Sequence, residues 1–186
     1  MPLLLLTPDL FELAACRVLA TRMRNALTEG VSFAVVDRIP LEGITLEEAK
    51  ALYWLFSGMI ARPVAQKLDG TMVYDVHDTG KRALPGSGVR PDKTNVDLTF
   101  HNDNAYNQTM PEIVGLFCLR QAQAGGLSRA ISFQTEHYMQ PGQIQYVNNR
   151  AIGHSRTAFV DHADPGLRRY LVRLWLRDAA HRGYCG

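Results

Sequence analysis

Apolar and polar residues in the first third of the chain recur with the period of a helix. A helix-start signal occupies residues 7–9, and Gly30 closes the segment. Between them the apolar positions keep helical spacing, at Leu10, Leu13, Ala14, Val18 and Leu19. A capping box at residues 45–48 predicts a second amphipathic helix that continues to Ile60. The pattern therefore predicts two N-terminal helices.

The rest of the chain consists of short β-type runs separated by turn signals. The runs fall at residues 31–36, 71–76, 96–100, 113–119, 129–133, 143–147 and 170–176. Turn signals separate several of them, at Gly125-Gly126, Pro141-Gly142, Asn148-Asn149 and residues 164–166, and the Gly- and Pro-rich residues 81–93 predict a surface loop. Many short strands with this punctuation predict a mainly β fold with flanking helices, either a sandwich or a barrel.

Composition narrows the class of protein further. The chain has 186 residues, which suits one domain, and its net charge of +2 is too small to predict binding to nucleic acid or to an anionic membrane. Its three cysteines are far apart, at Cys16, Cys118 and Cys185, so we expect neither a zinc finger nor a disulfide framework. No apolar stretch is long enough to span a bilayer. These features favour a cytoplasmic protein.

A His-x-Asp pair follows the predicted strand at residues 96–100. Residues two apart in an extended chain point the same way, so His101 and Asp103 can face one point in space. A second histidine, His154, follows the run at residues 143–147 and its turn. Two histidines and one carboxylate form the facial triad of non-haem Fe(II) oxygenases, which leaves metal positions open for cosubstrate and O₂. On its own, His-x-Asp is a weak signal, because the same pattern is more often two surface polar residues at the end of a strand.

Other histidines compete for the role of metal ligand. Asp75-Val76-His77 has the same spacing in reverse, and three further histidines are candidates, at His137, His162 and His181. Nothing in the neighbouring sequence adds a second ligand to any of them. We therefore expect these histidines to be structural or surface residues.

An arginine-bearing apolar segment near the C-terminus favours an anionic ligand. In a strand, Arg169, Leu171 and Arg173 share one face. Two arginines on the inner face of a barrel would be costly without an anionic partner. A dicarboxylate such as 2-oxoglutarate supplies one, because guanidinium grips a carboxylate in a bidentate fork. The alternative interpretation is a solvated strand face.

Three stretches, residues 94–106, 114–129 and 141–159 with the arginine strand, resemble a known family. They are similar to the taurine dioxygenase and 2,4-D dioxygenase (TauD/TfdA-like) family of Fe(II)/2-oxoglutarate-dependent oxygenases, related to clavaminate synthase. The resemblance implies a double-stranded β-helix, or jelly-roll, core with N-terminal helices. It also implies Fe(II), 2-oxoglutarate and O₂ as cofactor and cosubstrates.

The resemblance assigns roles to the residues at matching positions. His101, Asp103 and His154 match the catalytic iron ligands. Arg169 matches the arginine that pairs with the distal carboxylate of 2-oxoglutarate, and Ser128 matches a hydroxyl that helps to hold it. Arg173 matches a position that contacts either the cosubstrate or an anionic substrate. Asn104 and Tyr106 match positions on the substrate side of the site, although packing within a turn is nearly as typical of both residues.

One departure from the family concerns length. Family members carry a long insert between the Gly-Gly strand and the distal histidine, whereas here Ser128 and His154 are close in sequence. We therefore expect a single oxygenase domain over residues 1–186, with disordered segments absent from the sequence near residues 132–133 and 139–140. If the chain is truly this short, part of the barrel and the substrate lid are missing.

The predicted function is that of a dioxygenase, an oxidoreductase that oxidises a small, anionic or amino-acid-like molecule. Hydroxylation is the expected outcome, with release of succinate and CO₂. Asp103 argues against a halogenase, because halogenases lack this carboxylate. Two alternatives stay open: a catalytically inactive small-molecule-binding barrel, and a zinc-dependent hydrolase that uses the same triad. The expected partner is a small-molecule substrate, and both a monomer and a homo-oligomer are compatible with the sequence.

Overall fold

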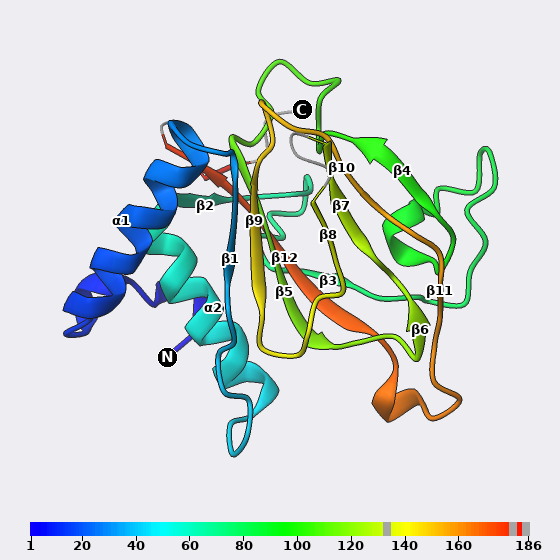
Figure 1. Ribbon diagram of the computed structural model, residues 1–186, viewed down its shortest axis with the longest axis horizontal. Coiled ribbons are helices and arrows are strands. Elements are labelled where there is room, and N and C mark those ends of the chain that lie inside the picture. Colours follow the sequence, from blue (N-terminus) through cyan, green and yellow to red (C-terminus); the bar gives the residue numbers. More distant parts are fainter. Residues whose placement is uncertain (132–134, 179–181, 184–186) are drawn as a thin grey trace.

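The protein is built in three layers, two helices on a six-stranded sheet that faces a four-stranded sheet (Figure 1). This computed structural model describes residues 1–131, 135–178 and 182–183. The larger sheet has the order β1-β9-β5-β12-β2, with β3 also paired to β12, and the smaller has the order β4-β10-β7-β8. A two-stranded sheet joins β11 and β6, and every strand pair is antiparallel. The prediction of a mainly β fold with N-terminal helices is confirmed.

The α-helices are α1 (Ala14–Thr28) and α2 (Leu46–Ile60), and the short 3₁₀ helices are η1 (Leu3–Leu5), η2 (Pro8–Leu10), η3 (Pro91–Lys93) and η5 (Pro165–Leu167). The strands of the larger sheet are β1 (Phe33–Val36), β2 (Arg62–Val64), β3 (Tyr74–Val76), β5 (Ile113–Arg120), β9 (Ile144–Asn148) and β12 (Tyr170–Arg177). The remaining strands are β4 (Leu98–His101), β6 (Ala124–Gly125), β7 (Ser128–Ala130), β8 (Thr135–His137), β10 (His154–Arg156) and β11 (Phe159–Val160).

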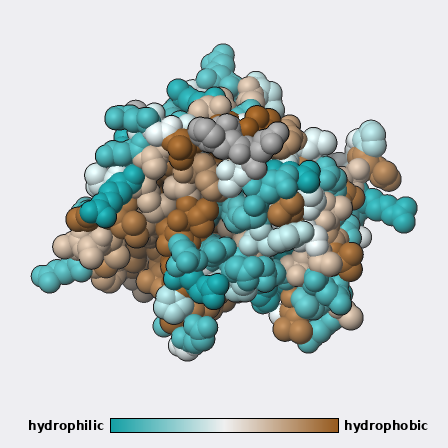
Figure 2. Space-filling view, in the orientation of Figure 1, coloured by the Kyte–Doolittle hydropathy of each residue, from teal (hydrophilic) through white to brown (hydrophobic). Residues whose placement is uncertain are grey.

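Local sequence signals explain α2 well and α1 only in part. The capping box is present, since Thr45 Oγ1 accepts a hydrogen bond from the Glu48 amide and Glu48 accepts one from the Thr45 amide. The first helix, however, begins at Ala14 and not near Pro8, where only the short η2 forms. The predicted apolar face is wrong as a result, because α1 buries Ala20, Met23 and Leu27. Val18 and Leu19 stay exposed, and Figure 2 shows apolar surface on this side of the molecule.

Strand β12 pairs with β5 on one side and with β2 and β3 on the other, and its two faces pack against different clusters. Val172, Leu174 and Leu176 pack in the cluster that includes both helices. Leu171 and Trp175 belong to clusters on the opposite face, toward the smaller sheet. Arg173 shares that second face by alternation and is 5% exposed. The interpretation of this segment as a solvated strand face is therefore wrong, and the arginine lies between two sheets.

Several smaller expectations can be compared with the structure. Residues 81–93 form a loop, as predicted, but it ends in η3, where Asp92 is buried. The run at residues 31–36 forms β1, which is a partly exposed edge strand. Cys16 and Cys118 are free thiols. No helix in the described ranges is long and apolar enough to cross a membrane. Residues 132–134, His181 and Cys185 lie outside the described residues.

Candidate functional site

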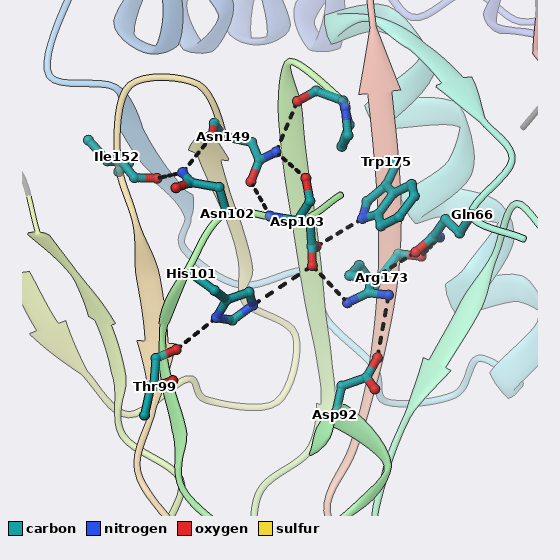
Figure 3. A network of polar contacts seen from close by, with 11 residues as sticks. Gln66, Asp92, Thr99, His101, Asn102, Asp103, Asn149, Ile152, Arg173 and Trp175 are labelled. Atoms are coloured by element: carbon teal, nitrogen blue, oxygen red, sulfur yellow. Dashed lines mark hydrogen bonds and ion pairs between the residues drawn. The ribbon is translucent and has the colours of Figure 1, made fainter. Parts of the chain in front are cut away.

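His101 closes β4 and points its ring into the space between the two sheets (Figure 3). Its Nδ1 lies 2.8 Å from the Thr99 carbonyl oxygen. A carbonyl only accepts hydrogen bonds, so Nδ1 carries the proton and the lone pair is left on Nε2. That Nε2 faces Asp103, with 3.8 Å to its Oδ1. The backbone of β4 therefore fixes both the tautomer and the direction of this histidine.

His154 begins β10, directly opposite His101 in the antiparallel register. The two rings lie 4.5 Å apart between centroids. His154 is 7% exposed, and its Nδ1 has no hydrogen-bond partner among the described residues. The pKa of His154 is lowered to about 4, chiefly by burial; the Asp103 carboxylate opposes this shift, and the Arg173 cation adds to it. The imidazole is therefore neutral at pH 7, the form that binds a metal.

Asp103 sits in the turn after β4, and its backbone is held by one side chain. Asn149 Oδ1 accepts a hydrogen bond from the Asp103 amide at 2.8 Å, and Asn149 Nδ2 donates to the Asp103 carbonyl at 2.9 Å. Asn149 Nδ2 also donates to the Pro111 carbonyl at 3.1 Å, and Asn102 Nδ2 donates to the Asn149 carbonyl at 2.6 Å. The turn that presents the carboxylate is thus fixed by a network of buried amides (Figure 3).

Each oxygen of the Asp103 carboxylate has its own donor on β12. Arg173 Nη1 lies 3.3 Å from Oδ1, and Trp175 Nε1 donates to Oδ2 at 2.9 Å. Burial alone would raise the pKa of Asp103, but Arg173, His154 and the Trp175 hydrogen bond outweigh it and lower the pKa. The carboxylate is therefore ionised at neutral pH.

The three side chains meet the requirements of a metal site. One ligand atom from each of His101, Asp103 and His154 lies within 4.8 Å of the others, and no other such group of three occurs in the part of the chain that the structure describes. Two imidazoles and one carboxylate suit a divalent transition metal. The unpartnered Nδ1 of His154 is a buried polar atom that a ligand would satisfy.

Each nitrogen of the Arg173 guanidinium faces a protein acceptor, although Nη2 makes an ion pair and no hydrogen bond within the described residues. Its Nε donates to Gln66 Oε1 at 2.8 Å, and its Nη2 forms an ion pair with Asp92 Oδ2 at 3.4 Å. Its guanidinium also lies over the rings of Tyr74 and Trp175, at 4.8 and 5.3 Å from the centroids. Arg173 thus links Asp103 to two residues from distant parts of the sequence.

Arg169, directly before β12, has a different environment. It is 7% exposed, and its Nη1 has no hydrogen-bond partner within the described ranges. Burial and the nearby Arg156 lower its pKa to about 10, against a weaker opposing effect of Asp161. The main chain is anchored, because Asp161 Oδ1 accepts a hydrogen bond from the Arg169 amide at 2.7 Å. A buried guanidinium with an unused donor is suited to an anion.

A small cavity joins these residues. Its lining includes His101, His154, Ser128, Arg169, Arg173 and Asp92. The cavity measures about 50 Å³, and it shares Met139 and Arg169 with a larger hollow of about 440 Å³. Ser128 Oγ donates to Gln145 Oε1 at 2.5 Å, next to a Gly-Gly turn in which Gly125 and Gly126 both have positive φ. The predicted iron ligands and cosubstrate residues are therefore brought together.

Asn104 and Tyr106, by contrast, are absent from the described lining of this cavity. Asn104 has a φ of 57° and accepts a hydrogen bond from Asn107 Nδ2, a contact that closes the turn. Tyr106 is 77% exposed. Their placement on the substrate side stays a prediction.

The competing histidines pack against aromatic rings. His77 meets Tyr170 edge to face at 5.8 Å, and His137 meets Phe33 in the same way at 5.8 Å. The carbonyl of His162 lies 3.4 Å from Arg168 Nε. None of these three belongs to the described metal-binding group.

Sequence reasoning missed several residues of the site. Trp175 is two residues from Arg173 on the same strand face, a signal that alternation alone supplies. Asn149 was interpreted only as part of a turn. Asp92 and Gln66 gave no local signal, because they meet Arg173 through contacts that only the fold creates.

Comparison with known proteins finds relatives of this chain in sequence and in structure. In sequence, the chain is 32% identical over 100 residues to FR-33289 synthase of Streptomyces rubellomurinus (strain ATCC 31215). That alignment covers 54% of this chain and only 28% of the relative, so the chain matches less than a third of that protein's length.

Solved structures show the same fold. An asparagine oxygenase in complex with Fe(II), 2S,3S-3-hydroxyasparagine and succinate superposes with a TM-score of 0.66 at 18% identity, over 88% of this chain and 79% of its own. The non-heme iron oxygenase OrfP in complex with Fe, succinate and (3S)-hydroxy-L-Arg superposes with a TM-score of 0.63 at 12% identity, over 87% and 81% of the two chains.

The family model for taurine catabolism dioxygenase TauD, TfdA family matches residues 8–132 and 128–175, which include the His-x-Asp pair, the distal histidine and both cavity arginines. The sequence resemblance, the shared fold and the triad thus agree, and the chain belongs to the TauD/TfdA family.

Proposed function

We propose that this protein is an Fe(II)- and 2-oxoglutarate-dependent dioxygenase that oxidises a small amino-acid-like or anionic molecule. Hydroxylation is the proposed outcome, with release of succinate and CO₂. The observation that carries the proposal is the triad, in which ligand atoms of His101, Asp103 and His154 lie within 4.8 Å of one another. Membership of the TauD/TfdA family supports the same reaction class.

The proposed metal ligands are His101, Asp103 and His154. When bound, Fe(II) with 2-oxoglutarate supplies the activation of O₂ that oxidises a C–H bond of the substrate. The chain's own residues hold the neutral and anionic donor atoms in place before any ligand arrives. Preorganised ligands lose little conformational entropy on binding, so the fixed tautomer of His101 and the clamped turn of Asp103 favour the metal-bound state.

The proposed cosubstrate contact is Arg169. Arg169 lines both hollows, and its Nη1 has no partner among the described residues, so the distal carboxylate of 2-oxoglutarate can approach it from the larger hollow. Ser128 lines the same cavity, and the assignment of its hydroxyl to that carboxylate stays a prediction, which requires the hydroxyl to give up its hydrogen bond to Gln145. Val76, Leu98, Leu116 and Met139 also line the cavity and restrict water there. The contact of Arg173 with cosubstrate or substrate stays a prediction.

Two broader features belong to the proposal. The opposed antiparallel sheets, with the site between them, support a double-stranded β-helix core. The amino-acid-like substrate class is supported by relatives whose structures contain hydroxylated asparagine or arginine. A reducing, cytoplasmic setting is consistent with the free thiols of Cys16 and Cys118.

Anaerobic spectroscopy tests the proposed reaction class. Addition of Fe(II) and 2-oxoglutarate should produce a weak visible charge-transfer band that needs both components. His101→Ala should abolish the band, whereas the control His162→Ala should keep it, because the His162 side chain lies outside the triad. Admission of O₂ with substrate should then release succinate.

The rival functions give different results. An inactive binding protein would bind 2-oxoglutarate and form the band, yet release no succinate with any amino acid or anionic substrate. A zinc hydrolase would retain zinc tightly, show no band with Fe(II) and leave 2-oxoglutarate unchanged. Either result would overturn the proposed function.

A further inference from the structure

Asp92 is a buried carboxylate next to the metal site, and it interacts with Arg173, with the Tyr74 hydroxyl and with the Arg156 cation. It lies in η3, which Thr94 pins by donating from Oγ1 to the Pro91 carbonyl at 2.8 Å. Asp92 is 7% exposed, and neither of its oxygens has a hydrogen-bond partner among the residues that the structure describes. Its ion pair is with Arg173 Nη2, at 3.4 Å from Oδ2. Burial of a carboxylate without hydrogen bonds is costly, so a specific role for Asp92 is expected.

The partner of Asp92 is the same guanidinium that holds Asp103. Nη1 of Arg173 faces Asp103 Oδ1 at 3.3 Å, while Nη2 faces Asp92 (Figure 3). The two carboxylates therefore contact the two terminal nitrogens of one guanidinium group. Gln66 holds the third nitrogen, and the rings of Tyr74 and Trp175 restrict the guanidinium plane. Arg173 cannot turn toward either carboxylate without losing the other.

We propose that Asp92 is a positioning residue for the metal site: by holding one end of Arg173, it keeps that arginine from closing a bidentate pair with Asp103. This inference rests on the proposed function, since it concerns affinity for the metal of the same triad. A bidentate guanidinium–carboxylate pair would occupy the lone pairs that a metal needs. With Asp92 in place, Arg173 orients Asp103 Oδ1 and leaves the carboxylate able to face His101.

The charges of these buried groups also favour a role of Asp92 in metal binding. Asp92 and Asp103 carry two negative charges and Arg173 one positive charge, so the three buried groups together carry one negative charge. Neutralisation of Asp92 would leave these three groups with no net charge, and it would remove a counter-charge of the buried Arg156 in the same cavity. Both the lost charge and the released arginine should weaken metal binding.

Titration of the full chain with Co(II), under conditions that keep the protein folded, tests this inference. Asp92→Asn should weaken Co(II) binding about tenfold, the size typical of an outer-shell partner, and should alter the visible d–d spectrum of the bound ion. Asp97→Asn is the matched control, because Asp97 is exposed, lies five residues after Asp92 and loses the same charge on substitution. It should bind Co(II) within about twofold of the wild type, with an unchanged spectrum, as expected for a surface charge.

A purely structural role gives a different pattern. If Asp92→Asn lowers the melting temperature but keeps the Co(II) affinity and spectrum of the wild type, the inference is overturned. If that variant does not fold, Arg173→Lys decides, because lysine keeps the charge but cannot reach three partners at once. It should also bind Co(II) about tenfold more weakly, the same outer-shell magnitude, and wild-type affinity contradicts the inference. Failure of the wild type itself to bind Co(II) would instead refute the proposed function.

Discussion

Arg169 and Arg173 lie four residues apart and line the same cavity, yet their surroundings are opposite. Arg173 has a protein partner at each of its three nitrogens, two of them carboxylates. Arg169 is almost as deeply buried, but its Nη1 has no partner within the described ranges and its pKa is lowered to about 10 by burial and Arg156. At Arg173 each guanidinium nitrogen faces a protein acceptor, even though Nη2 makes an ion pair and no hydrogen bond, and we call this the complete end of the cavity. The end at Arg169 is the incomplete end.

The difference shows how two arginines on one segment take separate roles. An anion that approached Arg173 would have to displace Asp92, whereas Arg169 can receive an anion without breaking an ion pair. The complete end therefore orients the metal-binding carboxylate, and the incomplete end is suited to the cosubstrate. The predictions that follow test this division.

The largest expected effect is a difference in protein stability between substitutions of the two arginines. Arg173→Met leaves Asp92 and Asp103 buried without their cation, and should lower the free energy of unfolding of the metal-free protein by about 3–5 kcal/mol. Arg169→Met removes a buried charge with an unpaired donor and should change it by less than about 1 kcal/mol, in either direction. Urea unfolding of both variants measures the difference. Similar losses for the two substitutions would contradict the division.

The second effect concerns pH and His154. The pKa of His154 is about 4 in the folded protein, against an ordinary value of 6.5 that applies to the unfolded chain. As pH falls below 6.5, the unfolded chain therefore binds a proton at His154 that the folded protein does not bind. The metal-free protein should therefore lose stability as pH falls from 6.5 toward 4, by up to about 3 kcal/mol from this residue. His137, whose pKa burial also lowers, adds in the same direction.

Urea unfolding across this pH range measures the loss. His154→Gln should flatten the profile, because glutamine does not titrate. The lowered pKa of Asp103 acts in a separate window, since its stabilisation is lost only as pH falls below the ordinary carboxylate value of 3.8. A profile between pH 6.5 and 4 that is the same in wild type and His154→Gln would show that His154 is not held neutral.

The third effect tests the backbone clamp at the complete end. Asn149→Ala removes three buried hydrogen bonds, two of them to Asp103, and should lower the free energy of unfolding by about 2 kcal/mol. Asn95→Ala is the control, because Asn95 is exposed and should change stability by less than about 0.5 kcal/mol. Thermal or urea unfolding distinguishes them. Equal stability of the two variants would mean that the clamp contributes little.

The sequence predicted the elements whose signals are local. The capping box at Thr45 located α2, and alternation along residues 170–176 assigned Arg173 and Leu171 to one face of the strand. The predicted start of the first helix was wrong, because only η2 forms over residues 8–10 and α1 begins at Ala14 after a break in the helical backbone. Apolar residues there resemble a buried helix face but stay partly exposed.

The site was predictable only where residues are close along the chain or match the family. His101 and Asp103 follow from strand spacing, and His154, Ser128 and Arg169 from resemblance; all five line or adjoin one cavity. Asp92 and Asn149 could not be predicted, because each acts on a residue tens of positions away that only the fold brings near. Long-range pairing of this kind leaves no periodic signal in a single sequence.

The affinity of the Fe(II)-loaded protein for 2-oxoglutarate, measured anaerobically, tests the division between the two arginines most directly. Arg169→Gln should weaken 2-oxoglutarate binding about 10- to 100-fold, since it removes a charge-assisted contact worth roughly 1.5–3 kcal/mol. Arg168→Gln, the exposed neighbour, should bind like the wild type. Unchanged affinity in Arg169→Gln, or an equal loss in Arg168→Gln, would contradict the assignment of the incomplete end to the cosubstrate.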